Sequence, residues 1–211
     1  MINFLHKKFR YNYFYATIII TLINILVFIL TSIQPVYKYY LALNPSAVID
    51  SHMYWQLITC IFVHGNLQHL FFNIFGFVMF GLYVEKSIGS KEFLLYFFVC
   101  GIISNALSLL IYVITGYWNV FLMGASGVLF SILFAFAVIF PTVRVFIFGI
   151  IPVPAPVLVL IYTAIEIFDQ VFGIDSNVAH MTHLFGFLGA WLYFVIRFGV
   201  NPIKIWKDSL T

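Results

Sequence analysis

Residues 93–143 contain no charged side chain, and this long uncharged stretch limits the possible folds more than any other feature of the sequence. The stretch is about twice the ~20 residues that one membrane-spanning helix requires. Because hydrocarbon cannot satisfy unpaired backbone groups, it must fold as helices or as a closed barrel. Continuous apolar runs without period-two alternation favour helices, so we expect two helices that turn near residues 115–119.

The rest of the chain has the same character. Apolar residues make up 64% of the sequence and charged residues 8%, with a mean hydropathy of +1.08, which excludes a water-soluble class. Glycine, proline and charged residues separate six apolar segments, each long enough to span a bilayer. These segments are residues 14–33, 65–84, 93–115, 124–143, 153–173 and 178–198. The sequence therefore predicts an all-α membrane protein, a bundle of six transmembrane helices forming a single domain over residues 1–211.

The basic residues indicate how the bundle is oriented. With the N-terminus in the cytoplasm, only Lys38 of the ten basic residues falls on the outer side. The inner side would hold Lys7, Lys8, Arg10, Lys86, Lys91, Arg144, Arg197, Lys204 and Lys207. By the positive-inside rule, we expect a multi-pass protein of a bacterial inner membrane with both termini cytoplasmic. The formal charge of +3 is small and forms no basic stripe, so we expect no nucleic-acid partner.

Polar side chains within membrane spans are costly, which makes each of them a functional candidate. They occur here in three groups, one at the start of each even-numbered segment. The groups are His64, His69 and Asn73; then Ser126; then His180 and His183. Because consecutive helices alternate in direction, all three groups would lie ~5 to 12 Å below the outer surface, at about 1.5 Å of rise per residue. Residues that build one site must share such a level.

These groups contain the parts that acyl transfer needs: a nucleophile, a base and donors for the developing oxyanion. Ser126 would begin a helix, near free backbone N–H groups and the positive end of the helix dipole. Gly124 and Gly127 permit a tight turn and close approach by a neighbouring helix. A histidine can serve as the base near neutral pH, and both His180 and His183 are candidates.

Each element also has a structural interpretation, since small residues and single histidines often only pack helices together. Convergence at one depth favours a site instead. Gly186 and Ala190 follow His183 by three and seven residues, a small-residue stripe that would let the sixth helix approach the fourth. This spacing favours His183 over His180 as the base. Near the outer end of the fifth segment, Glu166 and Asp169 are expected to snorkel or to bond locally, with no catalytic role.

In their order along the chain, these motifs resemble those of the rhomboid family of intramembrane serine proteases, and the resemblance spans nearly the whole sequence. The matching motifs are Trp55-Gln56 in the first outer connection, H-x4-H-x3-N at His64, His69 and Asn73, the inner turn over residues 81–90, G-x-S-G at residues 124–127, and H-x-x-G at His183 and Gly186. Two positions depart from the family pattern. Gln56 stands where arginine is frequent, and Phe185 where a smaller residue is frequent.

The resemblance implies a rhomboid-like bundle that cleaves transmembrane segments of membrane proteins through a Ser/His dyad without a third acid. Ser126 would be the nucleophile and His183 the general base. The oxyanion hole would use the Ser126 backbone N–H with the side chains of His69 and Asn73. The supporting residues would be His64, Gly124, Gly127, Phe130 (which could pack against the base) and Gly186. The resemblance also suggests residues 171–179 as a movable cap and the fifth helix as a lateral gate.

Three other functions compete with this interpretation. A metal-dependent protease would use the histidines as zinc ligands, but the H-E-x-x-H motif is missing, so we expect neither a metal nor another cofactor. A non-catalytic rhomboid-like protein would bind or escort membrane helices without needing both Ser126 and His183. A transporter or channel would need polar residues through the inner half. The expected partners are transmembrane protein substrates and membrane lipid.

Overall fold

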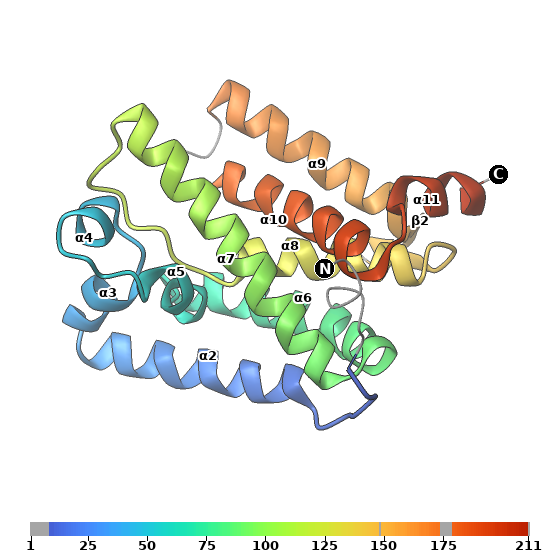
Figure 1. Cartoon of the computed structure of the whole chain (residues 1–211), viewed down its shortest axis with the longest axis horizontal. Coiled ribbons are helices and arrows are strands. Elements are labelled where there is room, and N and C mark those ends of the chain that lie inside the picture. Colours follow the sequence, from blue (N-terminus) through green and yellow to red (C-terminus); the bar gives the residue numbers. More distant parts are fainter. Residues whose placement is uncertain (1–8, 148, 174–178, 211) are drawn as a thin grey trace.

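A computed structural model describes residues 9–147, 149–173 and 179–210, and helices dominate these regions (Figure 1). Within these described regions, five helices are long and apolar enough to cross a membrane. They are α2 (Ala16–Ile33), α6 (Leu67–Ile88), α7 (Ser90–Thr115), α9 (Ala155–Phe172) and α10 (His180–Tyr193), which continues into the π-helical turn η2 (Phe194–Phe198). The all-α membrane bundle expected from the sequence is confirmed, although the helix at the fourth expected span, residues 124–143, is shorter than the others.

That shorter helix is α8 (Ser126–Ile139), which has 14 residues instead of the stretch 124–143 expected from hydropathy. It starts at Ser126, as expected, and the chain before it enters the bundle in extended form. Leu122 and Leu43 exchange backbone hydrogen bonds of 2.8 and 2.9 Å in an isolated β-bridge, and the Gly124 N–H donates to the Cys60 carbonyl at 3.0 Å. It ends before Pro141, which cannot continue a helix. The first turn of α8 therefore lies inside the bundle.

The first connection folds into short helices that gather at one end of the molecule (Figure 1). These are α3 (Val36–Leu41), α4 (Pro45–Ile49), α5 (Gln56–Thr59) and the 3₁₀ turn η1 (Cys60–Phe62). Gln56 is fully buried among them. Its Oε1 accepts the Asn44 backbone N–H at 3.0 Å, and its Nε2 donates to the Tyr39 carbonyl at 3.0 Å. Gln56 thus ties the connection together at the position where the motif often has arginine.

Two elements that the sequence did not predict follow α8 and α10. A hairpin of β1 (Arg144–Ile147) and β2 (Ile151–Pro154) joins α8 to α9 as an antiparallel pair. The last helix, α11 (Pro202–Leu210), packs against the bundle through Trp206, whose Nε1 donates to the Ala137 carbonyl at 3.0 Å. The proline-rich start of α9 and the proline near the end of α8 explain why helix is interrupted between them.

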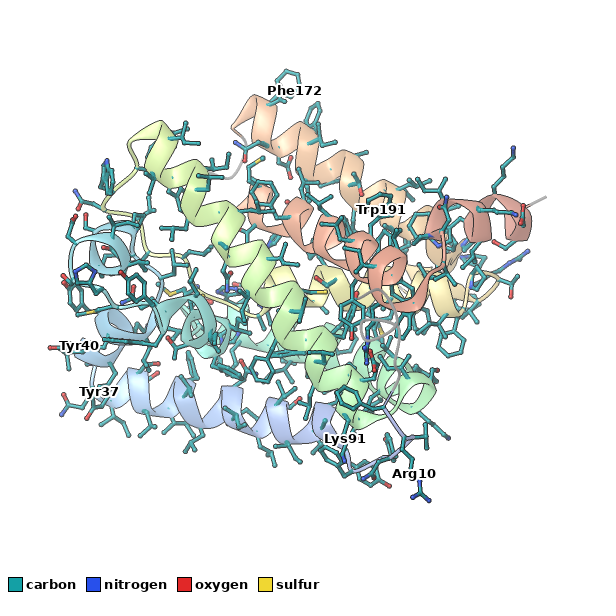
Figure 2. The ribbon with its side chains drawn as sticks, in the orientation of Figure 1. Arg10, Tyr37, Tyr40, Lys91, Phe172 and Trp191 are labelled. Carbon is teal, nitrogen blue, oxygen red and sulfur yellow. The ribbon has the colours of Figure 1, made fainter. Side chains whose placement is uncertain are left out.

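The two ends of the bundle carry different side chains. Figure 2 shows Tyr37 and Tyr40 at the end formed by α3, whereas Arg10 and Lys91 lie near the start of α2, at the opposite end. At this second end the buried carboxylate of Glu85, in the last turn of α6, accepts hydrogen bonds from the first backbone N–H groups of α2. Helix N-termini leave such groups unpaired, so the carboxylate joins α6 to α2 by capping it.

Candidate active site

Ser126 is the first residue of α8, and the residues before it shape the space around its side chain. Gly124 has φ +123°, a backbone conformation that glycine adopts readily and other residues rarely adopt. A Cβ atom on Gly124 would lie 2.6 Å from His69 Nε2 and 3.8 Å from Ser126 Oγ. Only glycine at this position therefore allows the His69 ring to approach the serine so closely.

His183 lies in the first turn of α10, and its Nε2 is 2.8 Å from Ser126 Oγ, a hydrogen-bond distance. The ring is buried, with 8% of its surface exposed. Phe130, one turn after Ser126 on α8, stacks on it with a centroid separation of 4.3 Å and an interplanar angle of 13°. The imidazole is thus held in one orientation, with one ring nitrogen directed at the serine hydroxyl.

Two glycines explain how α8 and α10 come close enough for this contact. A Cβ on Gly186 would overlap the carbonyl oxygen of Gly127, and a Cβ on Gly127 would lie 3.1 Å from Thr182 Cγ2 on α10. The Ser131 hydroxyl lies between the two backbones, 3.0 Å from the Gly127 carbonyl oxygen and 2.8 Å from that of Gly186. The helices therefore pack backbone to backbone just below the serine and the histidine.

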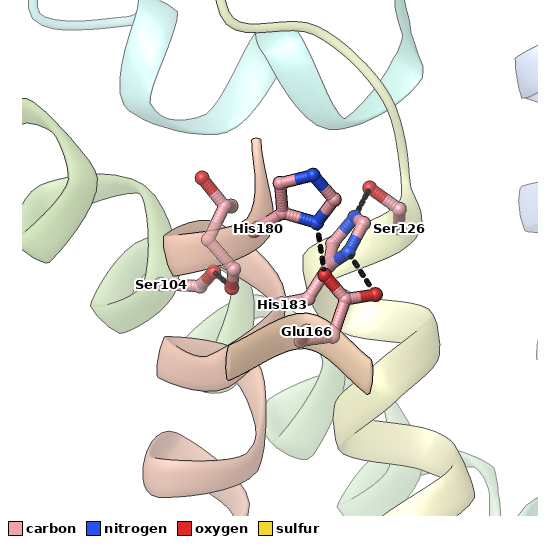
Figure 3. A network of polar contacts seen from close by, with 6 residues as sticks. Ser104, Ser126, Glu166, His180 and His183 are labelled. Atoms are coloured by element: carbon pink, nitrogen blue, oxygen red, sulfur yellow. Dashed lines mark hydrogen bonds and ion pairs between the residues drawn. The ribbon is translucent and has the colours of Figure 1, made fainter. Parts of the chain in front are cut away.

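A carboxylate from α9 completes the cluster, as Figure 3 shows. Glu166 is buried, and its Oε2 lies 2.6 Å from His180 Nδ1 while its Oε1 lies 2.9 Å from His183 Nδ1. Of the two expectations for Glu166, snorkelling is wrong and hydrogen bonding is observed, but the partners lie on α10 because α9 turns this residue toward that helix. One sequence signal could have found it: a carboxylate within an apolar span is by default a functional candidate.

The remaining predicted residues come from the first turns of α6 and the chain just before it. The rings of His64 and His69 meet edge to face at 5.1 Å, and Asn73 Nδ2 donates to the His69 carbonyl at 2.8 Å. His64 precedes α6, and burial lowers its pKa to about 4, so the ring is neutral at neutral pH. Its two nitrogens and Asn73 Oδ1 have no hydrogen-bond partner within the described parts of the chain. His64 and Asn73 line a small space that reaches Ala125, the residue before Ser126.

Glu166, His180 and His183 also have the composition of a metal site. Their potential ligand atoms all lie within 4.8 Å of one another. The contacts of Glu166 with the two rings have hydrogen-bond lengths, and a cation would have to replace the protons that these contacts share. The cap expected at residues 171–179 falls largely on residues 174–178, outside the described residues.

Fold and site together define a class: a polytopic membrane protein in which a serine and a histidine meet between the first turns of two helices. A family model described as the rhomboid domain matches residues 51–200. The chain belongs to the rhomboid family, and it is accordingly an integral, multi-pass membrane protein.

Among the relatives, one is named a putative protease and another an inactive protein. Rhomboid-like protein 15 of Arabidopsis thaliana is 32% identical over 162 residues, which are 68% of this chain and 40% of that protein. Putative rhomboid protease YdcA of Bacillus subtilis is 30% identical over 141 residues, 66% of this chain and 65% of that protein. Inactive RHOMBOID-like protein 8 of A. thaliana is 28% identical over 68 residues, 32% of this chain and 19% of that protein. The chain thus spans less than two thirds of each of these relatives.

Proposed function

We propose that this protein is an intramembrane serine endopeptidase that cleaves transmembrane segments of membrane proteins. The observation that carries the proposal is the 2.8 Å separation between Ser126 Oγ and His183 Nε2 inside the bundle. Family membership supports the reaction class. Because one relative is named inactive, the proposal depends on this pair and not on the family alone.

The roles follow from the chemistry of acyl transfer. Ser126 Oγ attacks the carbonyl carbon of the scissile bond while His183 Nε2 accepts its proton, and the same nitrogen then protonates the leaving amine. Water then attacks the acyl-enzyme while His183 Nε2 accepts its proton, and the same nitrogen returns a proton to Ser126 Oγ as the acyl group leaves. A substrate helix must unwind locally for its carbonyl to reach the serine, because a helical carbonyl is hydrogen-bonded within its own helix.

The oxyanion would be stabilised by the backbone N–H of Ser126 and by the side chains of His69 and Asn73. The N–H belongs to the first turn of α8, where backbone donors lack helical acceptors. His69 is close to the serine because Gly124 leaves it room. Asn73 uses one amide hydrogen for the His69 carbonyl, which leaves the second for substrate. His64 would support His69 by ring contact.

The membrane setting of the proposal follows the charge pattern. Both termini would be cytoplasmic in a bacterial inner membrane, and residues 1–211 would act as one domain with transmembrane proteins and lipid as partners. The tyrosine-bearing end shown in Figure 2 would then face outward and the basic end inward. The cluster at the first turns of α6, α8 and α10 would lie in the outer half.

Labelling with a serine-directed fluorophosphonate tests the proposal without a known substrate. Detergent-solubilised wild-type protein should be labelled, and Ser126→Ala should not, while both keep the same thermal unfolding temperature. Cleavage of a model transmembrane substrate should be lost in the same variant. Equal labelling of the two proteins, or cleavage that survives the substitution, would exclude Ser126 as the nucleophile. A wild-type protein that is neither labelled nor able to cleave would leave the non-catalytic escort.

A further inference from the structure

We propose that Glu166 is a positioning residue for His183, so that the site operates as a Ser126–His183–Glu166 triad and not as a dyad. This inference rests on the proposed protease function and goes beyond it. The carboxylate would fix which ring nitrogen carries the hydrogen and would stabilise the positive charge that the ring gains when it takes the proton of Ser126.

The three side chains lie in the spatial order that a triad requires, with the His183 ring between Ser126 and Glu166. Ser126 Oγ is 2.8 Å from Nε2 of the ring, and Glu166 Oε1 is 2.9 Å from Nδ1 of the same ring. A neutral imidazole that accepts a proton at Nε2 must carry its hydrogen on Nδ1, and that hydrogen needs an acceptor. Within the described chain, Nδ1 has no aligned hydrogen-bond partner, so the contact with Oε1 is close but oblique. Such contacts often align only once substrate is bound.

His180 holds the carboxylate in place for this contact. Its Nδ1 lies 2.6 Å from Oε2, the oxygen that His183 does not use. The two histidines are three residues apart on α10 and so face α9 together. With an imidazole at each oxygen, the carboxylate plane is fixed relative to the His183 ring.

Burial makes the charge of Glu166 effective. An ionised carboxylate shielded from water is costly unless it is paired or hydrogen-bonded. Glu166 is 6% exposed, and its two carboxylate oxygens each contact an imidazole. Proton transfer from Ser126 creates a cation 2.9 Å from Oε1, where the medium screens little. Among the residues that the structure describes, the titratable groups that face His183 are Glu166 from α9, His180 from α10 and His69 from α6.

The test compares Glu166→Gln with Glu166→Asp and with Asp169→Asn, which removes a carboxylate from the same helix three residues further on. Glutamine keeps the size but can donate its amide hydrogen to Nδ1, which favours the tautomer that cannot accept the serine proton. We expect Glu166→Gln to slow fluorophosphonate labelling and substrate cleavage by about 10²- to 10⁴-fold, as loss of the acid does in soluble triads. Glu166→Asp should recover part of the rate, and Asp169→Asn should match wild type.

The dependence on pH separates positioning from a merely structural contact. Loss of the carboxylate should move the acid limb of the rate–pH profile to lower pH, because the protonated imidazole is no longer stabilised. Thermal unfolding measured alongside should change little. A Glu166→Gln protein with the wild-type rate and profile, or with a lower unfolding temperature but an unshifted profile, would overturn the triad while the Ser126→Ala result still supports the protease.

Two further results would also be decisive. If a chelator changes the wild-type rate and Glu166→Gln abolishes that sensitivity, the three residues hold a metal and the triad is wrong. If the wild type is not labelled at all, the proposed protease function is wrong, and the triad that rests on it is wrong as well. Labelling of the wild type together with a slow, pH-shifted Glu166→Gln supports both proposals.

Discussion

Two buried glutamates at opposite ends of the bundle show how partners decide what a carboxylate can do. Glu85 accepts the backbone N–H groups of Ala16 at 2.6 Å and Thr17 at 2.8 Å, the Thr17 hydroxyl at 2.7 Å and the Ser90 hydroxyl. Glu166 faces two imidazole nitrogens instead. The exposed fractions are similarly low, 0% and 6%.

The difference lies in the exchangeable protons. Amide and hydroxyl donors do not ionise near neutral pH, so Glu85 has a fixed environment and contributes to stability by capping α2. Imidazoles gain and lose protons in this range, so the environment of Glu166 changes whenever a partner ring titrates or reacts. We therefore expect substitutions at Glu85 to affect folding and substitutions around Glu166 to affect turnover.

The largest expected effect separates the two histidines that share Glu166. His183→Ala should abolish cleavage and fluorophosphonate labelling, because removal of the base from a soluble serine protease costs on the order of 10⁶-fold. His180→Ala removes only the partner of the second carboxylate oxygen and should leave substantial activity. Both rates are measured on protein with a confirmed unfolding transition. An inactive His180→Ala beside an active His183→Ala would move the base one turn outward.

The next effect concerns the other glutamate. Glu85→Gln should lower the free energy of unfolding by about 2–3 kcal/mol, since several charge-assisted hydrogen bonds to α2 are weakened. The labelling rate per folded molecule should stay at the wild-type value. Thermal unfolding in detergent and active-site labelling measure the two quantities on the same samples. Loss of labelling without loss of stability would contradict the division of roles between Glu85 and Glu166.

The smallest expected effect tests the close packing that brings the serine to the histidine. Gly186→Ala would place a methyl group against the Gly127 carbonyl oxygen, a backbone atom that cannot move aside by itself. We expect a loss of about 1–3 kcal/mol in stability together with slower labelling. Gly189→Ala on the same helix is the control, because its Cβ would lie 3.4 Å from Ile103 and 3.6 Å from Cys100. Equal behaviour of the two variants would show that the α8–α10 spacing does not govern the site.

The sequence predicted the helices, and it predicted that Ser126 and His183 begin two neighbouring helices, because both depend on local properties. Hydropathy located α6 and α10 within a few residues, and counting helices placed His69, Ser126 and His183 at one level. Charge-free stretches and glycine-rich turns carry that information directly.

The role of Glu166 was not predictable in the same way, because it depends on how α9 is rotated about its axis. Sequence gives the depth of a residue on a helix, but most faces of α9 are apolar, so the pattern does not tell which face meets α10. The start of α8 at Ser126 agrees with the expectation from the sequence. The bridge between Leu122 and Leu43 that precedes it was not predictable, because the two residues lie far apart in the sequence.

That bridge fixes the length of the chain between Leu122 and Ser126. Only residues 123–125 separate Leu122 from Ser126, and an extended chain spans at most about 3.6 Å per residue. One inserted or deleted residue in this interval would shift the serine relative to the histidine or break the pairing with Leu43. Around Gly116 there is open space, and the turn after α7 can lengthen without reaching the site. Homologues should therefore vary in length at this turn and keep the short interval before the serine constant.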